Sequence, residues 1–200
     1  IFVASPNNPT GNMASEFEIR SLLDTGVLVV LDEAYYEFCN FTFADLIDEF
    51  DNLVILRTMS KWAGLAGLRV GYGIMSPILV NHLMDIKSPY NLSVTAEDAL
   101  IASIDDSAFL LKNVRSIVDE RDRLFSLLVD IDGLEPVPSS GNYILCEVKE
   151  YKKDFVVSGL ESEGIFVRTF NNESLRNCFR TAIGTPAQTD RMISVLKRLV

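Results

Sequence analysis

Three side chains able to do covalent and acid–base chemistry follow apolar segments in the first third of the sequence. Asp32 ends the segment GVLVVLD, and Tyr35 follows in the next few residues. Lys61 comes after NLVILRT, in a loop of mostly small and apolar residues. A solvated surface charge is a poor explanation for a lysine in such a loop, whereas a desolvated lysine can form an imine with an aldehyde. Lys61 is therefore the candidate nucleophile.

Hydroxyl, guanidinium and amide groups accompany these residues. Thr58, Ser60 and Arg69 supply two hydroxyls and a fork of N–H donors suited to a dianion, and GLAGLR lets the backbone approach it closely. Asn8, in SPNNPTG, offers an amide. With the acid, the phenol and the amine, these groups would hold a ligand bearing an aldehyde, a ring nitrogen, an acceptor beside the aldehyde and a phosphate. Pyridoxal phosphate has all four features.

Each residue also has an ordinary structural role open to it. Asp32 could cap a helix or form a loop salt bridge, and Asn8 could form an Asx turn before Pro9. Tyr35 lies in AYYEF, which is also typical of a packed aromatic loop. The joint occurrence of the groups favours the cofactor site more than any one residue does.

These loops meet only if a sheet brings them to one edge. The predicted strands are IFVAS (1–5), GVLVVLD (26–32), NLVILRT (52–58) and LRVGYGI (68–74). A capping box of Ser15 and Glu18 begins a helix through about Leu23, and ADLIDEF (44–50) is a second short helix. Alternating strands and helices predict a parallel α/β sheet, with ligands beyond the carboxyl ends of its strands.

The second half of the chain predicts a different architecture. Helices are expected after the Ser76-Pro77 cap and over 93–104, followed by a long amphipathic helix over 106–131 that bridges two domains. The segments after Gly133 then read as strand 141–148, helix 152–164, strands 165–170 and 177–184, and helix 185–199 with a capping box of Thr185 and Gln188. This pattern predicts a small α+β domain.

Composition excludes several classes of function. The formal charge of −10 comes from scattered acids and disfavours nucleic acid as a partner. No apolar run approaches the roughly 20 residues that cross a bilayer. Cys39, Cys146 and Cys178 lack metal-ligand spacing and are expected to be buried free thiols, as in a reducing compartment. His82, the single histidine, reads as part of an ordinary helix, so neither a metal site nor a histidine-based triad is expected.

The stretches SPNNPTG, LDEAYYEF and RTMSKWAGLAGLRVGYG resemble the cofactor motifs of the fold type I pyridoxal-phosphate aminotransferases. The joint spacing of Asp32, Lys61 and Arg69 makes the match specific. Within this family the chain is most similar to the histidinol-phosphate aminotransferase branch, with plant-type enzymes closest through AGLAGLRVGYG, PYN and ILCEV. The resemblance covers essentially all 200 residues but only about the C-terminal half of the family. It implies that 1–105 are the C-terminal part of the large parallel-sheet domain, and 106–200 the bridging helix and small C-terminal domain.

The resemblance also implies a role for each cofactor residue. Lys61 would bond covalently to the cofactor and then carry a proton between the substrate and the cofactor. Asp32 would keep the pyridine nitrogen protonated, and Asn8 and Tyr35 would hydrogen-bond the phenolic oxygen. The cofactor phosphate would be held by the hydroxyls and guanidinium of Thr58, Ser60 and Arg69.

Three residues match the family's substrate positions. Arg180 in FRTAIG would pair with the carboxylate of glutamate or 2-oxoglutarate, with Asn142 in SSGNYIL as its helper. Arg168 in FVRTF matches the position that reads the substrate phosphate in the histidinol-phosphate branch. Without the resemblance, ordinary salt bridges on a strand would explain both arginines.

The implied activity is transfer of an amino group between histidinol phosphate and 2-oxoglutarate in histidine biosynthesis. The alternatives are an aminotransferase for aromatic amino acids, a threonine-phosphate decarboxylase, or an inactive domain that keeps the fold as an interaction module. Small-molecule substrates and a homodimer are the expected partners, with no nucleic acid and no membrane. The expected location is the cytoplasm, or the plastid stroma in a photosynthetic eukaryote.

Ile1 begins inside what reads as a buried strand, so we expect the sequence to be part of a longer chain. On this expectation, the segment by itself binds cofactor poorly and exposes an unpaired sheet edge.

Overall fold

The structure is a computed structural model that describes residues 1–200, except the side chain of Tyr151. The chain divides into two compact units. The first unit comprises Ile1–Asn7 and Met13–Val114, and the second comprises Asn8–Asn12 and Arg115–Val200. The division falls inside helix α5 (Ser107–Val129), later than the expected boundary at 105/106. The grouping of Asn8–Asn12 with the second unit was not expected from any sequence pattern.

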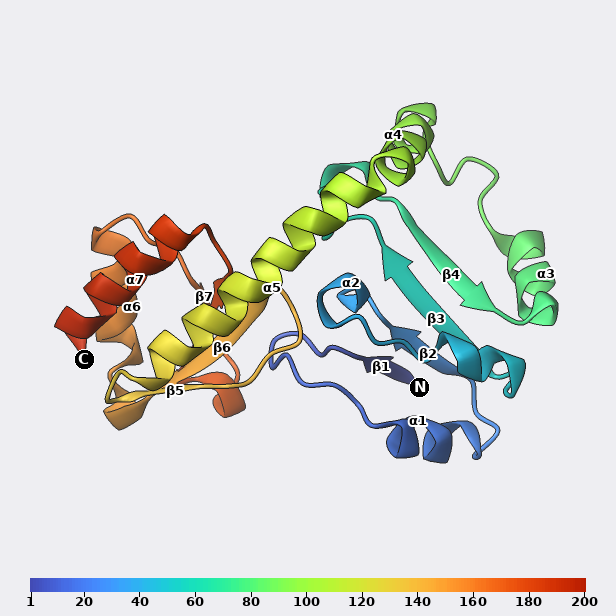
Figure 1. Cartoon of the computed structure of the whole chain (residues 1–200). Helices are drawn as coiled ribbons and strands as arrows, with labels where there is room; N and C mark the ends of the chain where they lie inside the picture. The colour runs from blue at the N-terminus through green and yellow to red at the C-terminus, as the bar shows by residue number, and fades with distance from the viewer. The chain divides into compact units, whose positions relative to one another are not determined.

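A four-stranded sheet forms the first unit, in the order β1 (Phe2–Ala4), β2 (Val29–Asp32), β3 (Leu53–Thr58) and β4 (Gly71–Met75) (Figure 1). The first three strands are parallel, as predicted. The expectation of a wholly parallel sheet is wrong at β4, which runs antiparallel to β3. If β4 were parallel to β3, the chain between them would need a crossover connection, usually a helix. The segment between these two strands contains only the 3-10 helix η2 (Ala66–Leu68).

Helix α1 (Glu16–Leu23) and the 3-10 helix η1 (Ala44–Asp48) pack on one face of this sheet. The predicted capping box is confirmed, because the Ser15 N–H donates to Glu18 Oε2 at 2.8 Å. The segment 44–50 was expected to be an amphipathic helix and forms only the 3-10 turn. The short helix α2 (Tyr36–Cys39) was not predicted. The core beneath them consists of Ile19, Leu23, Val29, Leu31, Phe43, Leu46, Leu53 and Ile55.

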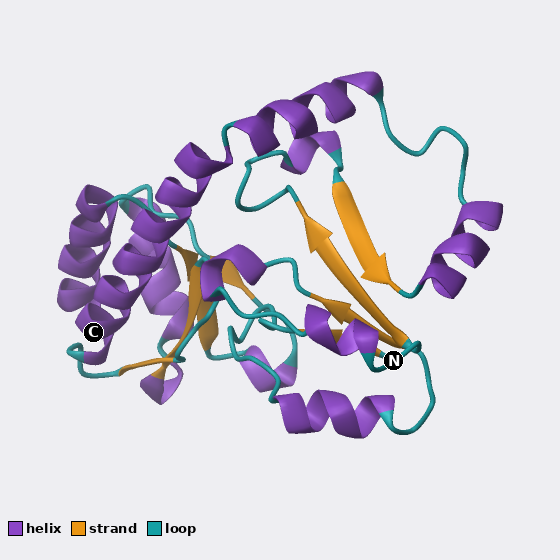
Figure 2. Ribbon diagram, turned by 45° about the vertical axis from the view of Figure 1, so that its right-hand side comes forward, coloured by secondary structure: helices purple, strands orange, loops and turns teal.

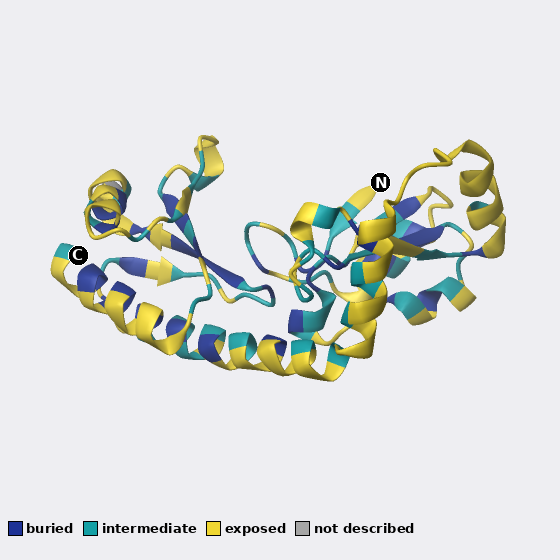
Figure 3. Cartoon of the chain, turned by 90° about the horizontal axis from the view of Figure 1, so that it is seen from above, coloured by how far each residue is buried: buried dark blue, intermediate teal, exposed yellow. Residues whose placement is uncertain are grey.

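Helices α3 (Pro77–Ile86) and α4 (Val94–Asp105) confirm the two helices expected after Ser76 and over 93–104. Ser76 has the extended backbone of an N-cap, but its hydroxyl makes no capping hydrogen bond, so that part of the expectation is wrong. Helix α3 contains no buried residue, and the carboxyl end of its apolar face is open, with Ile86 77% exposed (Figure 3).

The second unit contains an antiparallel sheet in the order β5 (Leu134–Pro136), β6 (Tyr143–Val148), β8 (Cys178–Ala182) and β7 (Arg168–Thr169). Helices α5, α6 (Lys153–Ser162) and α7 (Pro186–Leu199) supply the core against this sheet (Figure 2). Strand β5 was not predicted. Strand β7 is much shorter than the predicted 165–170, and Ile165 and Val167 before it pack against the helical core. The 3-10 helices η3 (Lys149–Tyr151) and η4 (Glu173–Leu175) complete the unit.

The three cysteines are free, as expected. Cys146 and Cys178 are buried and Cys39 is half-buried. Burial raises the pKa of the Cys146 thiol to about 12, so this group is protonated and inert at neutral pH. Among the described residues, no helix is long and apolar enough to span a membrane.

Candidate functional site

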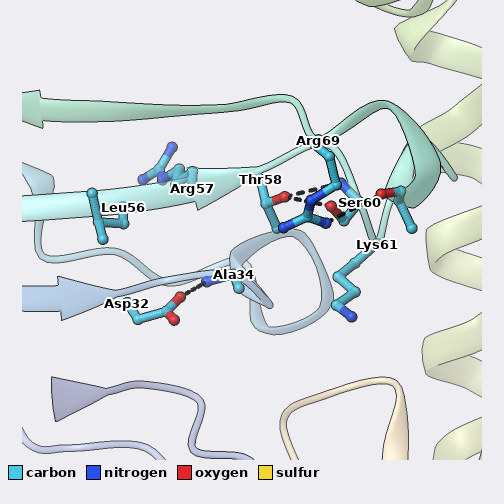
Figure 4. Close-up of a pocket in the computed structure, with 9 residues that line it drawn as sticks. Asp32, Ala34, Leu56, Arg57, Thr58, Ser60, Lys61 and Arg69 are labelled. Atoms are coloured by element: carbon cyan, nitrogen blue, oxygen red, sulfur yellow. Dashed lines mark hydrogen bonds between the residues drawn. The ribbon is translucent and has the colours of Figure 1, made fainter. Parts of the chain in front are cut away.

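A pocket of about 320 Å³ opens where β2 and β3 end (Figure 4). Its lining includes Asp32, Thr58, Ser60, Lys61 and Arg69. Five of the residues singled out from sequence therefore meet at one sheet edge. Because the strands are parallel, their carboxyl ends lie together, which is where ligands bind in open α/β sheets.

Asp32 is positioned by the strand ladder. It pairs in register with Leu56 of β3, and its carbonyl accepts the Ser5 N–H at 3.0 Å. Its Oδ1 accepts the Ala34 N–H at 2.9 Å, so the local turn-capping role considered as an alternative is present. The other carboxylate oxygen has no hydrogen-bond partner in the described part of the chain, and the side chain is exposed. Asp32 can therefore cap its turn and still offer an oxygen to a ligand.

Hydroxyl groups and a guanidinium meet at the end of β3. The Thr58 Oγ1 donates to Ser60 Oγ at 2.8 Å, and it accepts the Ser60 N–H at 3.1 Å. Arg69 has a left-handed backbone with φ of 57°, which is strained for a residue with a side chain. Its Nη1 donates to the Ala66 carbonyl at 3.2 Å. Figure 4 shows its side chain beside Thr58 and Ser60. This arrangement suits an anion.

The Lys61 loop is anchored from behind. Met59 and Val70 are buried against Ala96 of α4, and their backbones are joined by a hydrogen bond of 3.1 Å. Trp62 packs into this cluster. The bulky residue next to Lys61 therefore serves the core and does not cover the amine.

Lys61 itself is exposed, so the expectation of a desolvated lysine is wrong for this chain. Its Nζ lies 5.7 Å from the centroid of the Tyr35 ring, and that ring is only 8% exposed. Tyr35 does not line the pocket, but it adjoins the amine that does.

A buried ion pair beside the pocket was missed by sequence reasoning. Arg57 Nη2 lies 2.9 Å from Glu33 Oε2, and the Glu33 side chain is 1% exposed. Burial opposes the charge of Arg57, but hydrogen bonds to Tyr72 and Glu33 outweigh it and raise the pKa of the guanidinium. The available signal was the strand alternation, which places both residues on the face that holds the core. Two charges at core-facing positions must pair.

Glu37, on α2, is a further titrating group next to this pair. Burial raises its pKa to about 7, with the Arg57 charge opposing the shift and the Glu33 charge adding to it. No sequence pattern distinguished Glu37 from the other surface acids.

The substrate residues predicted from sequence lie in the second unit. Arg168 of β7 and Arg180 of β8 are register partners, so their side chains share one face of the sheet. The Arg180 guanidinium lies 5.1 Å from the Tyr143 ring centroid, and its Nη1 donates to Asn8 Oδ1. Asn142 precedes β6, and its carbonyl accepts the Ile183 N–H at 3.1 Å.

Asn8 is not among the residues that line the pocket, although it was expected to be a wall of the cofactor site. It groups with the second unit, and its Oδ1 accepts a hydrogen bond from Arg180 of that unit. His82 lies exposed on α3 and does not line the pocket either.

Comparison with known proteins gives the same family throughout. The sequence profile of aminotransferase class I and II matches residues 1–196. A histidinol-phosphate aminotransferase of Dehalococcoides mccartyi (strain 195) is 45% identical over 98% of this chain and 55% of its own length. The chloroplastic histidinol-phosphate aminotransferase 1 of Arabidopsis thaliana is 41% identical over 99% of this chain and 48% of its own length. The expectation that plant-type enzymes are the most similar is therefore wrong.

Solved structures agree with the sequence relatives. The histidinol-phosphate aminotransferase of Sinorhizobium meliloti, in complex with pyridoxal-5'-phosphate, matches with a TM-score of 0.86 and 27% identity, over 99% of this chain and 56% of that chain. The present chain spans about half the length of the curated relatives it matches. By the profile match, the fold and the sequence similarity, this chain belongs to the aminotransferase class I and II family.

Proposed function

We propose that this chain carries the pyridoxal-phosphate site and the substrate arginines of a histidinol-phosphate aminotransferase. The observation that carries the proposal is the pocket that gathers Asp32, Thr58, Ser60, Lys61 and Arg69 at the carboxyl ends of β2 and β3. Its volume of about 320 Å³ is at the lower end of the range for small-molecule sites, which is roughly 300–1,000 Å³.

The donor set fits pyridoxal phosphate. Arg69 with the hydroxyls of Thr58 and Ser60 is a site for a dianion, and these three residues bind the phosphate. Asp32 offers an open carboxylate oxygen to a protonated ring nitrogen. Lys61 presents an amine to the same pocket. An acid, an amine and an anion site are the complement of this cofactor.

When bound, pyridoxal phosphate supplies an electron-withdrawing ring that stabilises negative charge at the substrate Cα. Lys61 Nζ would accept the proton from the substrate Cα and pass that same proton to the cofactor carbon that bore the aldehyde. Asp32 holds the proton at the ring nitrogen. The resemblance implies that Tyr35 and Asn8, neither of which lines the pocket, would donate hydrogen bonds to the phenolic oxygen of the cofactor.

Arg168 and Arg180 bind the substrate anions. Two guanidinium groups directly opposite each other on a sheet repel, so this pair favours binding of an anion on its face. Arg180, with Asn142 as its helper, pairs with the carboxylate of glutamate or 2-oxoglutarate, and Arg168 binds the phosphate of histidinol phosphate. The names of the most similar relatives support this substrate over an aromatic amino acid or threonine phosphate. The presence of all seven predicted cofactor residues in the sequence argues against an inactive module.

The proposal includes a homodimer, small-molecule substrates and a location in the cytoplasm or plastid stroma. The plastid alternative has support from relatives named as chloroplastic.

The test of the substrate assignment is Arg168→Ala in the full-length gene product, assayed with histidinol phosphate, phenylalanine and aspartate as separate amino donors. Loss of a charge-assisted contact to phosphate costs about 1.5–3 kcal/mol, which lowers kcat/KM for histidinol phosphate about 10- to 150-fold. The unphosphorylated donors should change much less. Arg176→Ala is the matched control, because Arg176 pairs with Glu173 on the surface of the same unit and should leave all donors unaffected. Equal losses for every donor in the Arg168 variant would remove the assignment.

A further inference from the structure

The buried ion pair of Glu33 and Arg57 lies at the ends of β2 and β3, and Arg57 is itself among the residues that line the pocket. Side chains alternate along a strand, and Glu33 and Arg57 continue the alternation of the core residues of β2 and β3. By the same alternation, Asp32 and Thr58 face the opposite side of the sheet. Figure 4 shows Leu56 and Arg57 directed to opposite sides of β3. The ion pair therefore joins the strand ends on their core-facing side, next to the pocket that Arg57 also lines.

Several hydrogen bonds and one ring contact fix the pair. Arg57 Nη2 donates to Glu33 Oε2 at 2.9 Å and to Thr42 Oγ1 at 2.6 Å. The Thr42 hydroxyl lies 2.8 Å from Glu33 Oε2, and the Phe43 N–H donates to Glu33 Oε1 at 2.8 Å. The Arg57 guanidinium carbon also lies 3.7 Å from the centroid of the Tyr36 ring. Both charged groups are thus bonded on several sides.

The residues of this network are direct sequence neighbours of cofactor residues. Glu33 follows Asp32, Tyr36 follows Tyr35, and Arg57 precedes Thr58. The backbone ladder also continues at this point, because the Glu33 N–H donates to the Leu56 carbonyl at 2.9 Å. Any shift of the ion pair would move the ends of β2 and β3 relative to each other.

We propose that Glu33 and Arg57 are positioning residues for the cofactor site. Their ion pair, stacked on Tyr36, sets the separation of the β2 and β3 ends and so holds Asp32 and Thr58 in place for the two ends of one ligand. This inference rests on the proposed pyridoxal-phosphate site.

A purely structural role makes a different prediction. Replacing both members of a buried ion pair by uncharged residues of similar volume often leaves stability unchanged, whereas removing one member strands a charge. The double variant Glu33→Gln with Arg57→Met therefore separates folding from positioning, since the introduced amide oxygen still offers an acceptor to the Phe43 N–H. Its thermal midpoint should stay near that of the unmodified protein.

The readouts are the dissociation constant for pyridoxal phosphate and the pH midpoint of the visible absorption of the bound cofactor. Misplacement of site groups by a fraction of an ångström should weaken cofactor binding about tenfold and shift the pH midpoint. The matched control is Arg20→Met with Glu49→Met, which removes a bidentate pair with bonds of 2.7 and 2.9 Å in the same unit. Neither readout should change in the control.

A second pair of variants keeps the test decisive if the double variant fails to fold. Tyr36→Leu removes the ring beneath Arg57 and should weaken cofactor binding, while Tyr36→Phe retains the ring and should restore it. Unchanged binding in both the double variant and Tyr36→Leu would overturn the positioning role. Failure of the unmodified protein to take up cofactor would instead overturn the proposed function.

Discussion

At the scale of single residues, side chains at the site and in its loops also have structural roles. Asp32 caps its own turn through one oxygen and keeps the other for a ligand. Trp62 packs behind the loop, which leaves its neighbour Lys61 open. Five of the cofactor residues selected from the sequence therefore meet in the pocket. The exposure of Lys61 depends on how its neighbours pack, which the sequence did not indicate.

The same scale explains what sequence could not reveal. Glu33 and Arg57 lie within the family stretches, but nothing in the sequence marks these two charged residues as partners of each other. Their pairing depends on the register of β2 against β3, which is a tertiary property. Alternation alone gives the face of each residue but not its partner.

Glu37 should make stability depend on pH. Burial raises its pKa to about 7 in the folded chain, from an ordinary 4.5, so the folded state binds a proton that the unfolded state releases between these values. Stability therefore falls as pH rises through this window. The free energy of unfolding of Glu37→Gln, taken relative to that of the unmodified protein, should rise by about 1–2 kcal/mol between pH 4 and pH 8, after allowance for partial exposure of the side chain.

Urea unfolding of both proteins across that pH range measures the effect. Glu161→Gln, an exposed acid on α6, serves as the control and should leave the pH dependence unchanged. Parallel pH profiles for Glu37→Gln and the unmodified protein would show that this carboxyl does not titrate abnormally.

At the scale of elements, local chemistry predicted the helices better than the strands. The capping boxes before α1 and α7 are specific local signals, and both form as expected. Strand direction is not local. The apolar segment of β4 is compatible with either direction, and the short link after Lys61 decides it. Strand length is not local either, because it depends on pairing with a neighbouring strand, and the two-residue strand β7 was predicted too long.

Ser15→Ala should destabilise the first unit by about 1 kcal/mol, because the Glu18 backbone N–H loses the Ser15 hydroxyl as its acceptor. Ser15→Thr keeps a hydroxyl at the same position and should retain most of that free energy of unfolding. Thermal or urea unfolding of the two variants measures the difference. If alanine and threonine behave alike, the cap does not stabilise α1.

At the scale of the whole molecule, the chain spans about half the length of the curated relatives it matches. Strand β1 lies at the edge of its sheet, with Phe2 82% exposed, and Lys61 is exposed as well. The expected burial of the first strand is thus not found in this chain. Sequence could indicate the family and the site residues, but the burial of a site depends on every segment packed around it.

The 200-residue chain by itself should bind pyridoxal phosphate at least about tenfold more weakly than the Dehalococcoides mccartyi relative, because an open pocket screens and solvates the groups that hold the ligand. Titration of both proteins with the cofactor, followed by visible absorption, measures the ratio. Comparable affinities would mean that the described pocket is sufficient.

The central claim is that the Lys61 amine captures the cofactor aldehyde. The most direct measurement is borohydride reduction of the full-length gene product saturated with pyridoxal phosphate, followed by peptide mapping by mass spectrometry, with Lys61→Arg as the control. The account predicts one reduced adduct, on Lys61, that is lost in the control. An adduct on another lysine, or none at saturating cofactor, would contradict it.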